Sequence, residues 1–351
     1  MLAISHAGTL QTLGQAANDY TAANVFRLYQ ERRPINTQRS QRAALELFTA
    51  FLRFCGIAPA GDLYEDPAAW QGVTFGLVTA FMQWLTQGGY AVHTINDRVS
   101  VVKTYLKMAH VAGYIPDGEI IRLQSLKSYS AKEGIDLDEK RTAEGIETRR
   151  GKKKSAPTFL TDSQIDTLCT PRNDTPQARR DALIFCLMFD HAMRVSEVSD
   201  LQIENIDRAA RMVTFYRRKT GKTSHHVLRG RAWQLLSEYL SRDNPASAGP
   251  LILASCKTGA LIPKGMSTAA IAARVREMGQ ALGIDALSPH DLRHAAATCA
   301  GNDERTSLNG LMRFGGWESA AVAVRYMNRA GDADNAGVHL GKDAPAWIES
   351  L

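Results

Sequence analysis

Residues 288–326 read SPHDLRHAAATCAGNDERTSLNGLMRFGGWESAAVAVRY, and the rest of the chain is best interpreted from this segment. The segment predicts a helix from Pro289, because Ser288 suits the cap before a first turn and proline suits the turn itself. His290 and Arg293 are three residues apart, so they project from one face of that helix. Free backbone N–H groups at a helix N-terminus also favour an anion. The pair therefore predicts a group that holds a phosphate.

Two side chains with useful chemistry follow in the same segment, the nitrogen donor Trp317 and the phenol Tyr326. Alone, a His-x-x-Arg pair is more often a solvated helix face, and a helical tyrosine is more often a packing residue. Two motifs upstream change that balance: residues 192–198 read AMRVSEV, and residues 218–222 read RKTGK. In this order and spacing, the set resembles the active site of the tyrosine recombinases, also called the phage-integrase family.

The resemblance implies a role for each charged or phenolic member of the set. Arg194 and Arg293 would grip the non-bridging phosphate oxygens, since a guanidinium stays charged and its fork matches phosphate geometry. Tyr326 would be the nucleophile, and the site must activate it because a free phenol is mostly protonated near neutrality. Lys219 would protonate the leaving 5′ oxygen, with Lys222 of the same turn as a rival for that role.

The remaining members of the set would assist these groups. His290 would act as a base or proton relay for the phenol, or donate to the phosphate. Many members of the family carry histidine where this chain has Trp317, and an indole can only donate one hydrogen bond and pack. Glu197 follows Arg194 by three residues and would orient it. Strand cleavage of this type implies neither a metal ion nor a nucleotide cofactor.

Patches of the second half resemble one family member, the recombinase Cre, more specifically. These patches are Gly315–Trp317, the tail after Tyr326, and the pair Ser267 and Thr268 before an alanine-rich helix. We expect Ser267 and Thr268 to contact DNA. Cre has an arginine after the Ser-Thr pair whereas this chain has Ala269, so the resemblance implies a different target sequence.

Composition supports an intracellular DNA-binding protein without deciding it. The chain has 351 residues, which suggests two domains, and its net charge of +6 suits a polyanionic partner. Five cysteines without a Cys-x-x-Cys spacing predict free thiols in a reducing compartment, with neither disulfides nor a metal site. The sequence shows no secretory signal and no apolar run long enough for a membrane span, so we expect a cytoplasmic protein with no membrane partner.

The first half predicts a helical DNA-binding domain. Residues 1–35 are expected to form an N-terminal arm with a short helix near residues 22–32. Residues 36–130 show helical periodicity and no strand pattern, which the resemblance identifies as the SAM-like core-binding domain. Residues 131–157 are charged and poor in apolar residues, and are expected to form a basic interdomain linker in which Lys152, Lys153 and Lys154 contact DNA phosphates.

The second half predicts a mostly helical catalytic domain over residues 158–330. Residues 212–216 and 224–228 are expected to form two strands around the lysine turn, and the other segments are mainly helical. The fold class is thus mainly α, with an α+β catalytic domain, a small antiparallel sheet and a C-shaped clamp on DNA. Residues 331–351 are expected to dock on a neighbouring protomer through Ala336, Val338 and Leu340, against the alternative of a frayed terminus.

The function predicted from these motifs is site-specific DNA recombination through a covalent 3′-phosphotyrosine link and a Holliday junction. The partners implied by the family are double-stranded DNA with inverted-repeat target sites and a homotetramer assembled on two such sites. Two alternatives remain. One is a type IB topoisomerase, which a relaxation assay on plasmids without target sites would distinguish. The other is a DNA-binding protein without catalysis, which covalent adduct formation would exclude.

Overall fold

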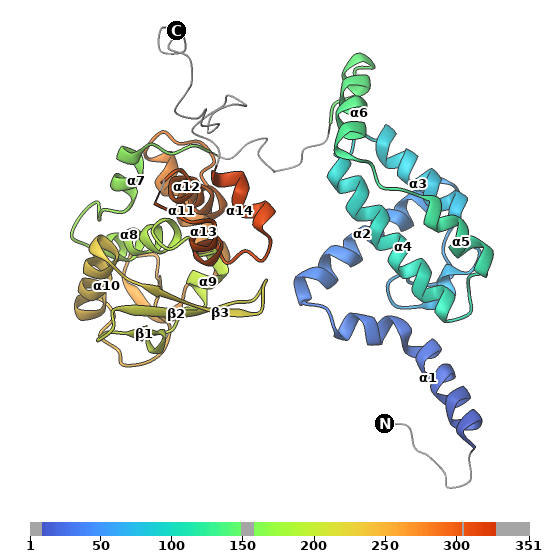
Figure 1. Cartoon of the computed structure of the whole chain (residues 1–351), viewed down its shortest axis with the longest axis horizontal. Coiled ribbons are helices and arrows are strands. Elements are labelled where there is room, and N and C mark those ends of the chain that lie inside the picture. Colours follow the sequence, from blue (N-terminus) through green and yellow to red (C-terminus); the bar gives the residue numbers. More distant parts are fainter. Residues whose placement is uncertain (1–8, 149–157, 304, 328–351) are drawn as a thin grey trace, which may run out of the picture. The chain divides into compact units, whose positions relative to one another are not determined.

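The computed structural model of the chain describes residues 9–148, 158–303 and 305–327. The chain divides into two compact units, residues 1–155 and residues 156–351 (Figure 1). Each unit has its own hydrophobic core. Within the described ranges, no helix is long and apolar enough to cross a membrane.

The first unit is helical throughout its described part. Its core is rich in aromatic side chains: Phe48 packs edge-on against Phe81 at 5.0 Å between ring centroids, and it stacks on Trp70 at 5.9 Å. Trp70 is fully buried, and so is Tyr105 in the same core. Such aromatic pairs add stability beyond the area that they bury. The elements are α1 (Leu10–Glu31), α2 (Ile35–Phe54), η1 (Pro67–Trp70), α3 (Phe75–Gln87), α4 (Val92–Val111), α5 (Asp117–Ser125) and α6 (Ala131–Ala143).

Two segments of this unit differ from the prediction. The expected arm contains the long helix α1, capped by Thr9, and its C-terminal part packs on the core through the buried Phe26. The expected linker begins with the helix α6. Its periodicity was weak because α6 packs through the small Gly134 against Val92 and through the buried Arg141, whose Nη2 donates to the Thr86 carbonyl at 2.6 Å. The prediction of a linker is therefore wrong for residues 131–143.

Over its described residues, the second unit is mostly helical with two small antiparallel sheets. The three-stranded sheet has the order β1-β2-β3, and Arg217 pairs with Lys222 at the end of the β2–β3 ladder. The elements are α7 (Asp162–Leu168), α8 (Pro176–Phe189), α9 (Val195–Ser199), η2 (Ile203–Asn205), β1 (Ile206–Asp207), β2 (Met212–Arg217), β3 (Lys222–Val227), α10 (Gly230–Arg242), β4 (Leu253–Ser255), β5 (Leu261–Gly265), α11 (Thr268–Gln280), α12 (Pro289–Asn302), α13 (Leu308–Gly315) and α14 (Ala320–Met327).

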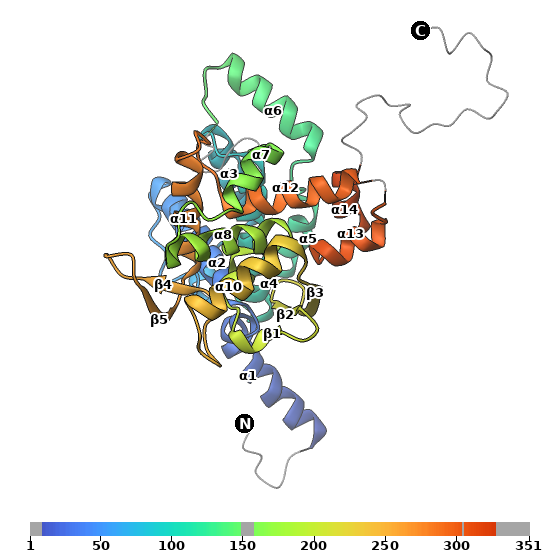
Figure 2. The same ribbon diagram turned by 90° about the vertical axis from the view of Figure 1, so that its left-hand side faces the viewer.

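The helix α8 is the centre of this unit. Its residues 179–188 are all buried, and it packs against both α10 and α12 (Figure 1). A helix that is buried all round must satisfy any polar group that it carries. The hairpin of β4 and β5, which the sequence analysis did not predict, lies at the far end of the unit from α13 and α14 (Figure 2).

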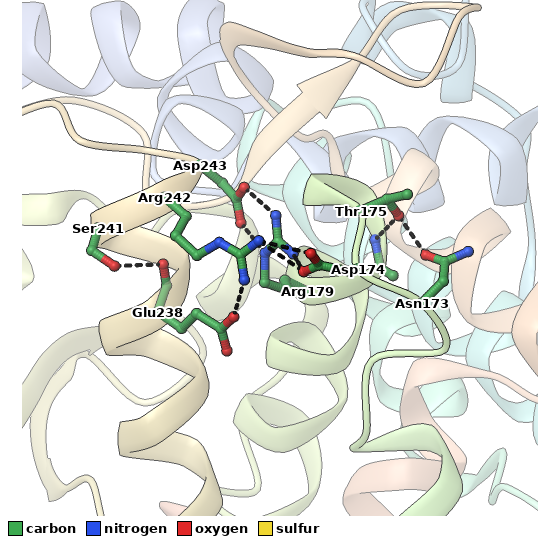
Figure 3. A network of polar contacts seen from close by, with 9 residues as sticks. Asn173, Asp174, Thr175, Arg179, Glu238, Ser241, Arg242 and Asp243 are labelled. Atoms are coloured by element: carbon green, nitrogen blue, oxygen red, sulfur yellow. Dashed lines mark hydrogen bonds and ion pairs between the residues drawn. The ribbon is translucent and has the colours of Figure 1, made fainter.

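A polar network joins the N-terminus of α8 to the C-terminus of α10 (Figure 3). Arg179 donates from Nε and Nη2 to the two carboxylate oxygens of Asp243, both at 2.7 Å, and the side chains of this pair are buried. At the edge of this network, the exposed Asp174 pairs with both Arg179 and Arg242, and Glu238 accepts a hydrogen bond from Arg242 at 2.6 Å. The buried pair thus links the start of α8 to the end of α10.

Replacing Asp243 with alanine should lower the free energy of unfolding by about 3–5 kcal/mol, because the buried Arg179 guanidinium would lose its two bonds to the Asp243 carboxylate and keep only the bond to the exposed Asp174. Urea unfolding of the isolated protein measures this loss. The matched control is Glu238→Ala, which removes an exposed partner in the same network and should cost less than about 1 kcal/mol. Equal losses in the two variants would show that burial does not strengthen the Arg179–Asp243 pair.

Candidate active site

The start of α12 has the geometry that the sequence predicted. Ser288 caps the helix, accepting a hydrogen bond from the Asp291 backbone N–H, and Asp291 returns a carboxylate to the Ser288 N–H at 2.8 Å. Pro289 occupies the first turn. This reciprocal capping fixes the first turn, so that His290 and Arg293 line the same cavity.

That cavity has a volume of about 660 Å³ and is lined by residues from segments far apart in the sequence. All six residues predicted to be catalytic lie in its wall. They come from the α9 N-terminus, the β2–β3 turn, α12, the loop after α13, and α14. The six are Arg194, Lys219, His290, Arg293, Trp317 and Tyr326.

Arg194 is held by a buried carboxylate. Its Nη1 donates to Glu197 Oε1 at 2.7 Å, and its backbone N–H donates to Oε2 of the same carboxylate at 2.8 Å. The Glu197 side chain is only 3% exposed whereas that of Arg194 is 22% exposed, so the guanidinium keeps a surface toward the cavity. A charge-assisted pair of this kind restricts the guanidinium to one orientation. The orienting role expected of Glu197 requires this contact, and the role itself stays a prediction.

Arg293 is more deeply placed than Arg194. Its guanidinium donates to the carbonyls of Ala192 and Gly315, and it lies 5.5 Å from the centroid of the Trp317 ring. Burial lowers the pKa of Arg293 to about 10, with Arg194 as the next cause. Since this value is well above neutrality, Arg293 is still a cation near pH 7. Ala192, which it contacts, has a φ of 48°, a left-handed conformation that non-glycine residues rarely adopt.

Tyr326 lies on α14 against two rings. It stacks on Trp317 with 5.1 Å between centroids and an interplanar angle of 15°, and it meets the edge of His294 at 5.1 Å. Its backbone approaches α12 so closely that a Cβ on Gly301 would come within 2.3 Å of the Tyr326 carbonyl oxygen. Trp317 thus positions the phenol by packing, which is the role open to an indole.

The two candidate lysines occupy different places. Lys219 lies in the β2–β3 turn, is exposed and lines the cavity with the other five residues. Lys222 begins β3 and pairs with Glu318 at 3.1 Å. It lines a second cavity, of about 1000 Å³, and not the cavity that holds the six residues. The structure therefore groups Lys219, and not Lys222, with the arginines.

The predicted DNA contacts are only partly within the described ranges. Ser267 caps α11 and Thr268 begins it, and both are exposed, but neither lines the cavity. Lys152, Lys153 and Lys154 lie outside the described residues, as does the tail with Ala336, Val338 and Leu340. Within the described part of the chain, no cluster of three or more His, Cys, Asp or Glu side chains could hold a metal ion.

Arg217 is a residue of the site's surroundings that the sequence analysis missed. It is fully buried at the end of β2, and its guanidinium bonds Glu197 and the segment before Trp317. A sequence signal was present. The residues that face inward on β2 are Val213, Phe215 and Arg217, so the alternation places a charged residue in line with two core residues.

The second unit is similar in sequence to proteins of one family. A model of the phage integrase family matches residues 158–332. Tyrosine recombinase XerC of Lactobacillus delbrueckii subsp. bulgaricus (strain ATCC BAA-365 / Lb-18) is 30% identical over 214 residues, which cover 58% of this chain and 70% of that protein. XerC of Roseiflexus sp. (strain RS-1) is 26% identical over 290 residues, covering 80% of each chain.

The fold is also found among solved structures. The Tn1549 transposon integrase, solved in complex with transposon right end DNA, matches 89% of this chain and 96% of its own with a TM-score of 0.59 and 11% sequence identity. The chain belongs to the phage integrase family, the tyrosine recombinases. It is a site-specific recombinase, and the topoisomerase and binding-only alternatives are not favoured. Its likeness to Cre stays a prediction, because the family match does not separate Cre-like members from others.

Proposed function

We propose that the cavity between α9, α12 and α14 is the catalytic centre, where Tyr326 attacks a DNA phosphate and becomes linked to the 3′ end of the cut strand. One observation carries this proposal: a single cavity brings together two arginines, a lysine, a histidine, a tryptophan and a tyrosine from five separate segments. Metal-free cleavage of a phosphodiester needs this combination of nucleophile, charge neutralisation and acid.

Arg194 and Arg293 bind the scissile phosphate from two sides. Both guanidiniums are held by other groups before any substrate arrives: Arg194 by Glu197, Arg293 by the carbonyls of Ala192 and Gly315. Donors that are already in place stabilise the charge that develops on a five-coordinate phosphorane without reorganising. This stabilisation supplies the largest share of the rate.

The protons move between Tyr326, the DNA and two side chains. The phenol loses its proton to His290 as its oxygen bonds to phosphorus, and the 5′ oxygen leaves as a hydroxyl with a proton from Lys219. A 5′ hydroxyl of a second strand then attacks the phosphotyrosine in reverse, which releases the phenol and joins the strands. Two such exchanges pass through a Holliday junction.

The substrate of this reaction is duplex DNA, in an intracellular setting. The net charge of +6 and the DNA-bound state of a protein with the same fold support a DNA partner. We infer target sites with inverted repeats and four protomers on two sites, with the residues after 330 joining neighbours. Ser267, Thr268 and Lys222, together with Lys152, Lys153 and Lys154, would contact the DNA backbone.

A covalent adduct tests the proposal directly. Duplexes that the wild-type protein enriches from a random pool supply a substrate whose sequence need not be known in advance. The protein should form an adduct that survives denaturing gels, in buffer containing a metal chelator. Relaxation of a supercoiled plasmid that lacks the enriched sequence should be absent. An enriched duplex that is bound without adduct would leave binding without catalysis as the function.

Lys219→Ala should cleave an ordinary enriched duplex at least about 100-fold more slowly than the wild type, which is the usual size of a general-acid contribution. A duplex with a bridging 5′ sulfur at the cleaved bond should restore most of that rate, since a thiolate leaves without a proton. The matched control is Lys222→Ala in the same hairpin, whose rates on the two duplexes should be lowered by equal factors. Sulfur rescue of Lys222→Ala alone would move the acid to Lys222.

A further inference from the structure

Arg217 makes contacts that connect the two phosphate-binding arginines. Its Nη1 lies 3.3 Å from Oε2 of Glu197, the carboxylate that holds Arg194 through its other oxygen. The same Nη1 lies 3.4 Å from the Gly315 carbonyl oxygen, which also accepts from Arg293. Arg217 therefore contacts one partner of each catalytic arginine.

These contacts form a ring that connects the two arginines of the cavity wall. Starting at Arg194, the ring passes through Glu197, Arg217, the Gly315 carbonyl and Arg293, and Arg293 returns to the Ala192 carbonyl two residues before Arg194. Apart from the backbone between Ala192 and Arg194, each link is a hydrogen bond or ion pair between residues that are buried or half-buried. The two guanidiniums are thus coupled through partners that also bond Arg217.

The rest of the Arg217 side chain secures the segment that ends at Trp317. Its Nη2 donates to the Phe314 carbonyl at 2.9 Å, and its Nε donates to Ser224 Oγ at 2.7 Å. Gly316 lies so close that a Cβ there would meet the Arg217 side chain at 2.4 Å, and its φ of 59° is left-handed. Glycine at this position permits the approach.

The backbone of Arg217 also supports the turn that carries Lys219. Its carbonyl accepts from the N–H groups of Thr220 at 3.0 Å and Gly221 at 2.9 Å. One residue thus contacts the lysine turn through its backbone and the supports of both arginines through its side chain. It does not line the catalytic cavity, so it acts through other residues.

Burial of this cation opposes its charged form. Burial lowers the pKa of Arg217, and Glu197 acts in the opposite direction. A fully buried guanidinium is costly unless its donors are satisfied, and a well-packed apolar residue is often at least as stable. Stability alone therefore gives a weak reason for an arginine at this position, whereas orientation of charged neighbours gives a strong one.

We infer that Arg217 is a positioning residue for catalysis, which orients Arg194 through Glu197 and Arg293 through the Gly315 carbonyl. The inference rests on the proposed function of those two arginines as phosphate ligands. If the inference is correct, loss of the Arg217 guanidinium should slow cleavage at a charged phosphate and should hardly affect cleavage at a neutral analogue of it.

The test compares two substrates. An enriched duplex is used whose cleaved position has been mapped, and a second duplex carries a neutral methylphosphonate at that position. Arg217→Lys keeps a positive charge but cannot supply the three-way fork. Single-turnover cleavage of the phosphate duplex should fall by about 10- to 100-fold, a smaller loss than removal of a direct donor causes. On the methylphosphonate duplex the same variant should be within about threefold of the wild type, because less charge develops there.

Arg180→Lys is the matched control, because Arg180 is also fully buried and also bonds a carboxylate and a carbonyl, those of Asp181 and Leu253. It lies outside the cavity wall. The unfolding temperature of Arg180→Lys should fall by about as much as that of Arg217→Lys. Its cleavage rates on the two duplexes should change by the same factor. The inference is overturned if Arg217→Lys also slows both duplexes by one factor.

Two further variants keep the outcomes distinct. If Arg217→Lys fails to fold, Ser224→Ala carries the test, since it removes only the acceptor of Arg217 Nε and should show a weaker, phosphate-specific loss. A loss common to both duplexes in Ser224→Ala would then overturn the inference. Arg194→Ala tests the proposed function separately. If this variant loses cleavage rate equally on both duplexes, the proposed phosphate clamp is wrong. If Arg194→Ala loses rate only on the phosphate duplex and Arg217→Lys does not, only the role of Arg217 is wrong.

Discussion

Tyr326→Phe should bind an enriched duplex with the affinity of the wild type and form no covalent adduct. The substitution removes one oxygen and keeps the ring, so the stack on Trp317 at 5.1 Å and the edge contact with His294 can persist. Without the phenol oxygen no bond to phosphorus can form, and the loss of cleavage should be complete within detection. Gel-shift titration and denaturing gels measure the two properties on one sample.

Tyr216→Phe serves as the control for this experiment. Tyr216 lies on β2 of the same unit, is 56% exposed and does not line the cavity. Tyr216→Phe also removes one phenol oxygen, and it should form the adduct within about twofold of the wild-type amount, because surface substitutions away from special features usually have small effects. An adduct formed by Tyr326→Phe would mean that another residue is the nucleophile.

Arg194→Ala and Arg293→Ala should each lower single-turnover cleavage by about 10²–10³-fold or more, as loss of one preorganised donor does in other enzymes. The two variants should differ in stability. Arg194 is half-buried at the cavity edge, whereas Arg293 is buried and satisfies the carbonyls of Ala192 and Gly315. Arg293→Ala should lower the unfolding temperature more than Arg194→Ala. It removes the Arg293 donor from the buried Ala192 carbonyl and leaves the Gly315 carbonyl with its 3.4 Å contact to Arg217, whereas after Arg194→Ala Glu197 keeps its bonds from the residue 194 backbone N–H and from Arg217.

Quench-flow cleavage at saturating protein separates the chemical step from binding in these variants. A residual loss of affinity is expected, since each arginine contributes one phosphate contact, but saturation removes its effect on the rate. Wild-type cleavage rates in either variant would contradict the proposed clamp. Thermal unfolding of the same samples shows whether a slow variant is folded.

The parts of the site that sequence could predict are those with local motifs. His290 and Arg293 share a helix face, Ser288 and Pro289 mark its start, and Arg194 with Glu197 forms a short box whose geometry follows from the spacing. Their meeting with Tyr326 in one cavity depends on tertiary packing, and it could be expected only from resemblance to a family. Which of the two lysines, Lys219 or Lys222, lines that cavity likewise depends on how the β2–β3 hairpin packs in the folded domain.

Two of the missed features, the helix α6 and the buried Arg217, share a physical cause, which is packing that does not use an apolar stripe. The helix α6 packs through Gly134 and the buried Arg141, so its sequence looks like a charged linker. Arg217 is a charged residue in an inward position, where periodicity predicts an apolar one. Its partners come from α9 and from the loop after α13, and no local pattern connects such distant segments.

The central claim is tested most directly by finding which atom of the protein joins the DNA. The wild-type protein is incubated with an enriched duplex that is nicked beside the mapped cleavage position, so that a short fragment escapes and the adduct accumulates. After protease and nuclease digestion, mass spectrometry identifies the peptide that carries the nucleotide. We expect one modified residue, Tyr326, bearing a 3′-linked nucleotide. Attachment to any other residue, or the absence of an adduct on a duplex that the protein binds and cuts, would contradict the account.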